Sequence, residues 1–166
     1  MKRGTPALAE ETRAALRCVP TGVAVVTAVR EGEARGITIN AFTSVSLEPP
    51  TLLVCINRQA RSYLYIAHSR CFALNVLAAE QVEIAERFSG KRRERQFEGL
   101  ATTSGNGDIP LIEGALAHFE CVVSAEHEVG SHSIFIAEIE RASHRVGEPL
   151  GYFDGAFRTF ALERIP

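Results

Sequence analysis

Apolar and polar residues alternate along much of the chain with a period of two, which is typical of half-buried β-strands. The clearest case is "ALAHFECVVSAE", in which apolar residues from Ala117 to Ala125 alternate with residues such as His118, Glu120 and Ser124. Similar runs predict further strands over residues 22–29, 36–48, 51–57, 71–77 and 133–146, and two short ones within 150–162. β-Structure therefore dominates the expected fold.

Three segments have helical rather than strand-like spacing. Thr5-Pro6 is a helix-opening pair, and Leu8, Thr12 and Leu16 follow on one face before Pro20 stops the helix. A short helix is expected over 63–68, and an amphipathic one over 78–88. Because several strands follow one another directly, the sheet is expected to be antiparallel. We expect it to close into a small barrel with a few flanking helices, an α+β fold that is mainly β.

Composition limits the class of protein. The 166 residues are enough for one domain, with an N-terminal helix within 1–20 and a barrel over 21–160. A net charge of −2 argues against nucleic-acid and membrane-surface binding, and no apolar run is long enough for a membrane span or signal peptide. The four cysteines are widely separated, which indicates free thiols. We therefore expect a cytoplasmic protein.

Several common catalytic motifs are missing. There is no G-x-S-x-G sequence for a serine hydrolase, and the five histidines lack metal-binding spacing. Gly105 and Gly107 begin a G-x-G, but Pro110 takes the third glycine position, which excludes a Rossmann dinucleotide site. Any nucleotide must therefore bind on a different scaffold.

The run "GITINAFTSVSLEPP", residues 36–50, gives the predicted strand two different faces. Ile37, Ile39, Ala41, Thr43, Val45 and Leu47 form the face that is expected to be core. Thr38, Asn40, Phe42, Ser44 and Ser46 form the other, which is polar but uncharged. Such a face either points at solvent or lines a site for a planar, polar-edged ligand.

The loop "NRQARSY" suggests a different chemistry. Ser62 is placed to cap the helix that follows, and Arg58 and Arg61 precede it. Two arginines at a helix N-terminus suit a phosphate group, although a solvated surface loop would have the same composition. The two stretches flank consecutive strands, so a ring site and a phosphate site would be neighbours.

The segments "GITINAFTSVSLEPPTLLVCINRQARS", "FALNVLAAEQVEIAERFSG", "GALAHFECVV" and "GSHSIFIAEIE" resemble the short-chain flavin reductases. These are the reductase components of two-component flavin-dependent monooxygenases. The resemblance runs from about Leu16 to Phe160. It implies a homodimeric split β-barrel that reduces FMN or FAD with NADH or NADPH and passes the reduced flavin to a monooxygenase.

By position, the resemblance also implies roles for individual residues. Arg61 and Ser62 match its phosphate-binding loop, and Phe88 lies near the far end of the flavin. His132 matches the histidine of a G-D-H turn that helps to hold the nicotinamide, although Ser131 here replaces the usual aspartate. Tyr152 and Phe153 match an aromatic position near the nicotinamide. The residues implied beside the flavin ring are Thr38, Asn40, Ala41, Phe42, Thr43, Ser44, Ser46, Cys55 and Ile56.

Three alternatives stay open at this point. His132 would also suit a solvated turn, and the basic run "KRRER" at 91–95 is expected to be a solvated helix face rather than a phosphate contact. A non-catalytic flavin- or haem-binding carrier or sensor on the same barrel is the alternative function. The sequence does not distinguish FMN from FAD or NADH from NADPH.

Overall fold

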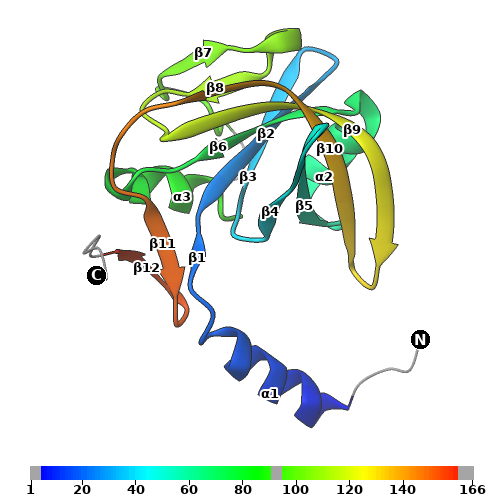
Figure 1. The fold of residues 1–166 in the computed structure, drawn as a ribbon, viewed down its shortest axis with the longest axis vertical. Helices are drawn as coiled ribbons and strands as arrows, with labels where there is room; N and C mark the ends of the chain where they lie inside the picture. The colour runs from blue at the N-terminus through cyan, green and yellow to red at the C-terminus, as the bar shows by residue number, and fades with distance from the viewer. Residues whose placement is uncertain (1–4, 91–94, 161–166) are drawn as a thin grey trace.

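A seven-stranded antiparallel sheet forms the body of the protein in a computed structural model, which describes residues 5–90 and 95–160 (Figure 1). Its strands, in sheet order, are β3 (Glu33–Ile39), β2 (Ala24–Arg30), β6 (Cys71–Val76), β9 (Ala117–Val129), β10 (His132–His144), β5 (Pro50–Asn57) and β4 (Phe42–Leu47). The mainly β, antiparallel class that the sequence predicts is confirmed. Residues 91–94 of the basic run at 91–95 lie outside the described residues, and Arg95 belongs to no helix, contrary to the predicted helix face.

Smaller elements surround this sheet. One small sheet joins β1 (Thr21–Gly22), β11 (Leu150–Phe153) and β12 (Ala156–Thr159), and another joins β7 (Thr102–Ser104) and β8 (Pro110–Ile112). The helices are α1 (Pro6–Leu16), α2 (Arg61–Ser69) and α3 (Val82–Phe88), with single turns of 3₁₀ helix at Ala79–Gln81 and Asn106–Asp108. In the part of the chain that the structure describes, no helix has the length and apolar character to cross a bilayer.

The run of residues 36–48 is two strands and not one. β3 ends at Ile39, the chain bends at Asn40 and Ala41, and β4 begins at Phe42. The two halves then lie at opposite edges of the seven-stranded sheet. A hydrogen bond of 2.9 Å from the Cys55 amide to the Ala41 carbonyl anchors the bend to β5. This bend brings the two sheet edges together where the barrel is split.

The bend also changes which side chains are buried. Ile39 lies in the core, but Val45 and Leu47 on the same predicted face are 53% and 84% exposed. The predicted core face is therefore wrong beyond Ile39, because a strict alternation holds only while the strand is straight. Pro50, expected to lie past the end of a strand, pairs with Leu47 as the first residue of β5. β3 begins at Glu33, earlier than expected, since the turn before it occupies only Glu31 and Gly32.

β2 is buried on both faces, which explains its almost unbroken apolar sequence. One face of β2 joins the barrel core with Phe72, Phe135 and Ile66 of α2. The other face packs under α3 in a second cluster that includes Ala85 and Phe88. α2 and α3 therefore both pack on the β2–β3 pair and border the same edge strand.

Asn75 is the centre of a buried polar network between β6, β2 and β8. Its side-chain amide donates to the Val25 carbonyl at 3.0 Å and to the Thr27 hydroxyl at 3.2 Å. Its side-chain oxygen accepts the Ile112 amide hydrogen at 2.8 Å. Both ends of the buried amide are satisfied, so the network ties β6 to β2 and β8 without leaving the Asn75 side chain unpaired.

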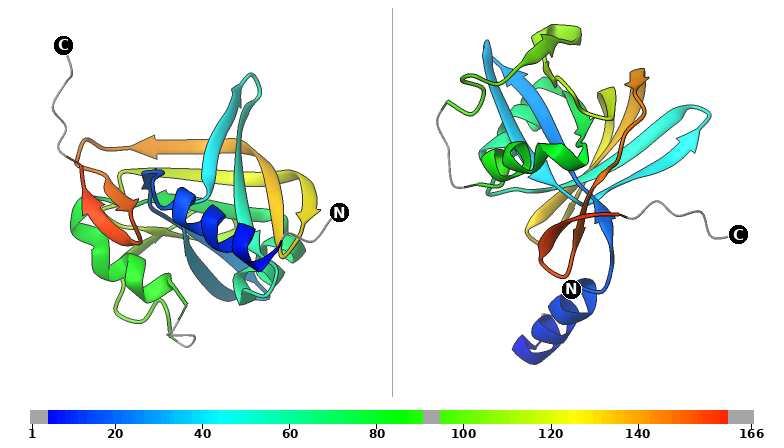
Figure 2. Two further views of the ribbon diagram at one scale, coloured as in Figure 1. Left: turned by 90° about the horizontal axis from the view of Figure 1, so that it is seen from below. Right: turned by 90° about the vertical axis from the view of Figure 1, so that its left-hand side faces the viewer.

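α1 lies apart from the body, as Figure 1 and the right-hand view of Figure 2 both show. Thr5 caps its N-terminus as predicted, but none of its residues is buried. The apolar side chains of Leu8, Leu16 and Val19 are 52–64% exposed. The hairpin of β4 and β5 also projects from the body in both views of Figure 2.

We predict that Asn75→Ala lowers the free energy of unfolding by about 2–4 kcal/mol, because it leaves the Ile112 amide buried without an acceptor. Denaturant unfolding followed by circular dichroism measures the change. Thr103→Ala, which removes an exposed hydroxyl from β7, is the control and should stay within about 0.5 kcal/mol of wild type. A wild-type midpoint for Asn75→Ala would contradict this account of the network.

Candidate functional site

Two cavities lie along the edge strand β3, one at its middle and one at its end. The first has a volume of about 130 Å³ and the second about 210 Å³. The end of α3 borders both, through Phe88 and Gly90 in the first cavity and Ser89 in the second. We call them the cationic cavity and the aromatic cavity, after the side chains described next.

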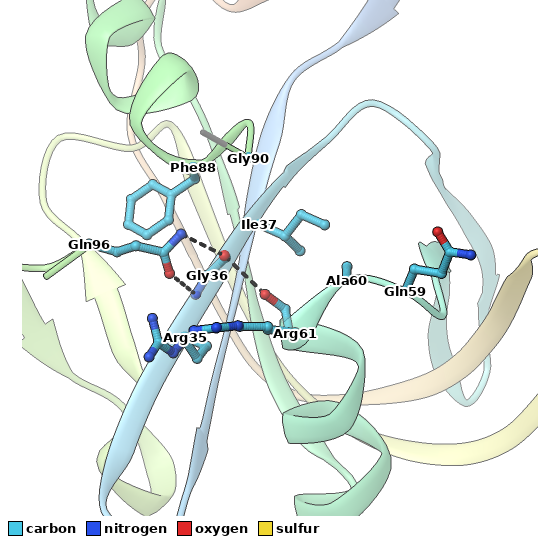
Figure 3. A pocket seen from close by; sticks show the side chains of 10 residues that line it. Arg35, Gly36, Ile37, Gln59, Ala60, Arg61, Phe88, Gly90 and Gln96 are labelled. Atoms are coloured by element: carbon cyan, nitrogen blue, oxygen red, sulfur yellow. Dashed lines mark hydrogen bonds between the residues drawn. The ribbon is translucent and has the colours of Figure 1, made fainter. Parts of the chain in front are cut away.

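The cationic cavity is built around the backbone of Gly36 (Figure 3). The side-chain amide of Gln96 accepts from the Gly36 amide at 3.2 Å and donates to its carbonyl at 3.3 Å. The hydroxyl of Ser62 donates to the same carbonyl at 3.0 Å. Ser62 is therefore not the helix cap that its position predicts: Ala60 is the N-cap of α2, and no side chain caps it. The buried hydroxyl instead ties α2 to β3.

Gly36 has no room for a side chain. A Cβ atom at this position would lie 2.6 Å from two ring carbons of Phe88. Phe88 is only 1% exposed, and its ring centroid lies 5.2 Å from that of Phe97. The Phe88 ring therefore lies directly on the strand, and the glycine permits this approach.

Two guanidinium groups give this cavity its positive charge, Arg35 from β3 and Arg61 from the first turn of α2. Arg35 is half-buried, and its guanidinium contacts the carboxylate of Glu33 and the hydroxyl of Tyr65. The Tyr65 hydroxyl also donates to Glu33 at 2.6 Å. That hydrogen bond, followed by the charge of Arg35, lowers the pKa of Glu33. The ion pair thus orients Arg35, while Arg61 is exposed at the cavity.

The aromatic cavity has no charged side chain in its lining. The rings of Tyr152 and Phe157 lie 5.7 Å apart in an edge-to-face arrangement on one side. Thr38 and Asn40 come from β3 and the bend, as the sequence predicts for one uncharged face. The Thr38 hydroxyl donates to the Ala85 carbonyl at 2.7 Å, and the Asn40 amide donates to the Thr21 hydroxyl at 3.2 Å. These bonds hold both side chains in place, and Asn40 is the exposed one of the two.

The other predicted ring neighbours lie outside both cavities. Ala41, Phe42, Thr43, Ser44 and Ser46 lie in the bend and β4, beyond the split. The Ser46 hydroxyl bonds to the backbone of Glu48. Cys55 is half-buried on β5, while the side chain of Ile56 is completely buried in the barrel core. Ile56, with an exposed fraction of 0%, therefore offers no accessible surface to a ligand.

His132 lies at a third place, the tip of the β9–β10 hairpin. It is exposed and pairs with Asn57 at the end of β5. The Ser131 hydroxyl lies 2.9 Å from His132 Nδ1, so the serine that replaces the usual aspartate of this turn contacts the imidazole. Phe153, 40% exposed, follows Tyr152 in β11. Among residues 5–90 and 95–160, no three His, Cys, Asp or Glu side chains gather to form a metal site.

Arg35, Gly36, Gln96 and Phe157 line the two cavities but were not singled out from the sequence. The signal for Arg35 was the start of the strand: β3 begins at Glu33 and therefore includes Arg35, whereas the predicted strand began at Gly36. Nothing local indicated Gln96, which lies sixty residues from its partner Gly36. Contacts of that separation depend on the tertiary fold.

A split barrel with a cationic and an aromatic cavity on one edge strand is an arrangement that suits a ligand with a charged phosphate and a neutral ring. The model of the family "Flavin reductase like domain" matches residues 16–161. The chain belongs to that family.

Similar proteins agree in sequence and in structure. The FMN reductase (NADH) SmoA of Agrobacterium fabrum is 39% identical over 151 residues, covering 91% of this chain and 86% of that protein. An NADH-dependent FAD reductase of Streptomyces globisporus is 40% identical, covering 86% and 80%. The solved NADH:FAD oxidoreductase SgcE6 of Streptomyces globisporus superposes with a TM-score of 0.88 at 35% identity, covering 97% and 98%.

We predict that Gly36→Ala destabilises the protein by about 1–3 kcal/mol, because the added methyl group forces the Phe88 ring off the strand. Thermal unfolding measures the loss. Gly22→Ala is the matched control, since its Cβ would meet only an ordinary contact at 3.4 Å with Phe42. Combining Gly36→Ala with Phe88→Leu should cost less than the sum of the two single changes. Strictly additive losses would show that the two residues do not clash.

Proposed function

We propose that this protein is a flavin reductase that oxidises NADH and transfers the hydride to FMN or FAD. The observation that carries the proposal is the pair of cavities along β3, one cationic and one aromatic and uncharged. A flavin nucleotide has the same division between a charged phosphate and a neutral ring. Its relatives named above include NADH-dependent reductases of both FMN and FAD, which supports NADH and leaves both flavins as substrates.

The residues present fit such a ligand. Arg61, together with Arg35, would neutralise the flavin phosphate. Ser62 and Phe88 also line that cavity. Thr38 and Asn40 would contact the flavin ring or its side chain. β4 has one ladder partner, so alternate backbone groups between Ala41 and Ser46 face away from the sheet and suit the polar edge of a flavin. The half-buried Cys55 on β5 extends this wall.

The chemistry requires little from the protein's own acids and bases. A bound flavin accepts a hydride, and the protein must hold the two rings together. We assign this role on the nicotinamide side to His132, oriented by Ser131, with Tyr152 and Phe153 as aromatic neighbours. This assignment agrees with a sequence that has no catalytic triad. Hydride transfer needs geometry rather than a nucleophile.

We further propose that the reduced flavin leaves for a partner monooxygenase. Another relative, 34% identical over 87% of this chain, is the reductase component of a 4-nitrophenol monooxygenase from Rhodococcus opacus. The carrier or sensor alternative is not favoured, because these relatives are named as reductases. Since NADH and flavin nucleotides are cytoplasmic metabolites, we place the enzyme in the cytoplasm.

A homodimer would explain two unusual surfaces. α1 has eleven residues and no buried side chain, and isolated helices shorter than about 12–15 residues are marginal in water. Val45 and Leu47 add exposed apolar area on the projecting hairpin. A second copy that packs against α1 and the hairpin would stabilise both, and its dyad would lie close to the split of the barrel.

The activity has a direct test. The purified protein, mixed with FMN or FAD and excess NADH without oxygen, should bleach the flavin's visible absorbance over many turnovers. NADPH in place of NADH should support a slower rate. Flavin binding without bleaching would overturn the proposal in favour of the carrier.

The dimer is tested by Leu16→Glu. A charge on the apolar face of α1 should shift the protein from dimer to monomer in sedimentation velocity at micromolar concentration. The barrel's far-UV circular dichroism should stay unchanged, because the Leu16 side chain is exposed. Ala14→Glu adds the same charge on the opposite face of α1 and should leave the dimer intact. A wild-type protein that sediments as a monomer would refute the dimer.

A further inference from the structure

Arg58 joins two parts of the site that lie far apart in the sequence. It follows Asn57 at the end of β5, in the loop that leads to Arg61 and α2. Its backbone amide donates to the Ser131 carbonyl at 3.0 Å. Its guanidinium donates to the Gly130 carbonyl at 2.8 Å and forms an ion pair with Glu128. One residue thus contacts both ends of the β9–β10 turn that carries His132.

This turn needs support from outside the hairpin. All the residues from Glu128 to His132 are exposed, so core packing does not hold them. Gly130 has a φ of +59°, the left-handed conformation that a two-residue hairpin turn requires. Because the Ser131 hydroxyl touches His132 Nδ1, a shift of the turn also shifts the imidazole. The contacts from Arg58 therefore add to the pairing of His132 with Asn57 of β5 in fixing where the His132 ring lies.

The loop on the other side has hydrogen bonds of its own. The Asn57 side chain accepts from the Gln59 amide at 2.9 Å, and the Ala60 amide donates to the Asn57 carbonyl at 2.9 Å. Ser62 fastens the start of α2 to β3. Without the Arg58 side chain this loop keeps its shape, whereas the turn loses its guanidinium clamp. The consequence should appear on the nicotinamide side and not on the flavin side.

We propose that Arg58 is a positioning residue for nicotinamide binding, acting through the β9–β10 turn on His132. The proposal rests on the function proposed above and adds a residue that has no role in it so far. Arginine suits the task because its planar group reaches a carboxylate and a carbonyl together, while the ammonium of a lysine is a single point of charge.

The test compares steady-state kinetics of Arg58→Ala, Arg58→Lys, His132→Ala and the double variant Arg58→Ala/His132→Ala. We expect Arg58→Ala to raise the KM for NADH by about tenfold while the flavin Kd, measured by fluorescence quenching, stays within about twofold of wild type. Arg58→Lys should recover part of the loss, because it retains the attraction to Glu128. The double variant should resemble His132→Ala, since groups that act through one another are not additive.

Arg145→Ala is the matched control. Arg145 also joins a glutamate, Glu80, to a glycine carbonyl, that of Gly114, but far from the hairpin turn. Arg145→Ala should leave the KM for NADH unchanged. This control distinguishes a positioning role of Arg58 from the general effect of losing a surface ion pair.

The outcomes are distinct. A wild-type protein that does not oxidise NADH with flavin refutes the proposed function itself. With an active wild type, three results each overturn the role of Arg58. These are an Arg58→Ala KM within twofold of wild type, equal weakening of flavin and NADH, and full additivity with His132→Ala. An unchanged KM in His132→Ala would do the same, because Arg58 would then have no residue to act through.

Discussion

The bend at Asn40 and Ala41 is the constraint on which the rest of the structure depends. It sends one continuous run of sequence to both edges of a single sheet, so β3 and β4 approach each other without forming a ladder. An unpaired strand edge leaves backbone groups that need partners. At Gly36 those partners are the side chains of Gln96 and Ser62, and the ring of Phe88 covers the strand beside them. The split therefore creates the cavities.

Charge is divided along this edge in a way that suits one kind of ligand. The cationic cavity takes Arg35 and Arg61 from two different elements, and Glu33 and Tyr65 orient the first of them. The aromatic cavity, at the end of the same strand β3, is lined by no charged side chain. A ligand that spans both needs a phosphate at one end and a neutral ring at the other. Uncharged walls also leave the reactivity to the bound nucleotides, as hydride transfer requires.

Short stretches of sequence single out several residues that line the cavities. Thr38 and Asn40 stand two apart in a run without charges, and the fold brings them into one cavity with Tyr152, a neighbour that the sequence did not predict. α2 begins at Arg61, two residues earlier than predicted, and Ser62 bonds to β3 and does not cap the helix. The predicted wall from Ala41 to Ser46 lies beyond the bend, outside either cavity. Residue spacing could not reveal the bend at Asn40 and Ala41, since the chain is extended on both sides of it.

Short-range patterns in the sequence were enough to predict the antiparallel β class, most of the strands, the three helices and a loop with two arginines, Arg58 and Arg61, apart from the uncharged positions Thr38 and Asn40. Local periodicity and turn chemistry suffice for these, because each depends on residues close together in the chain. Only the tertiary structure decided that Gln96 would complete the edge of β3, that Ile56 would face the core, and that Arg58 would clamp the turn before His132. Each of these contacts joins segments that become neighbours only after the sheet has formed. They therefore cannot be predicted from residues that are close together in the sequence.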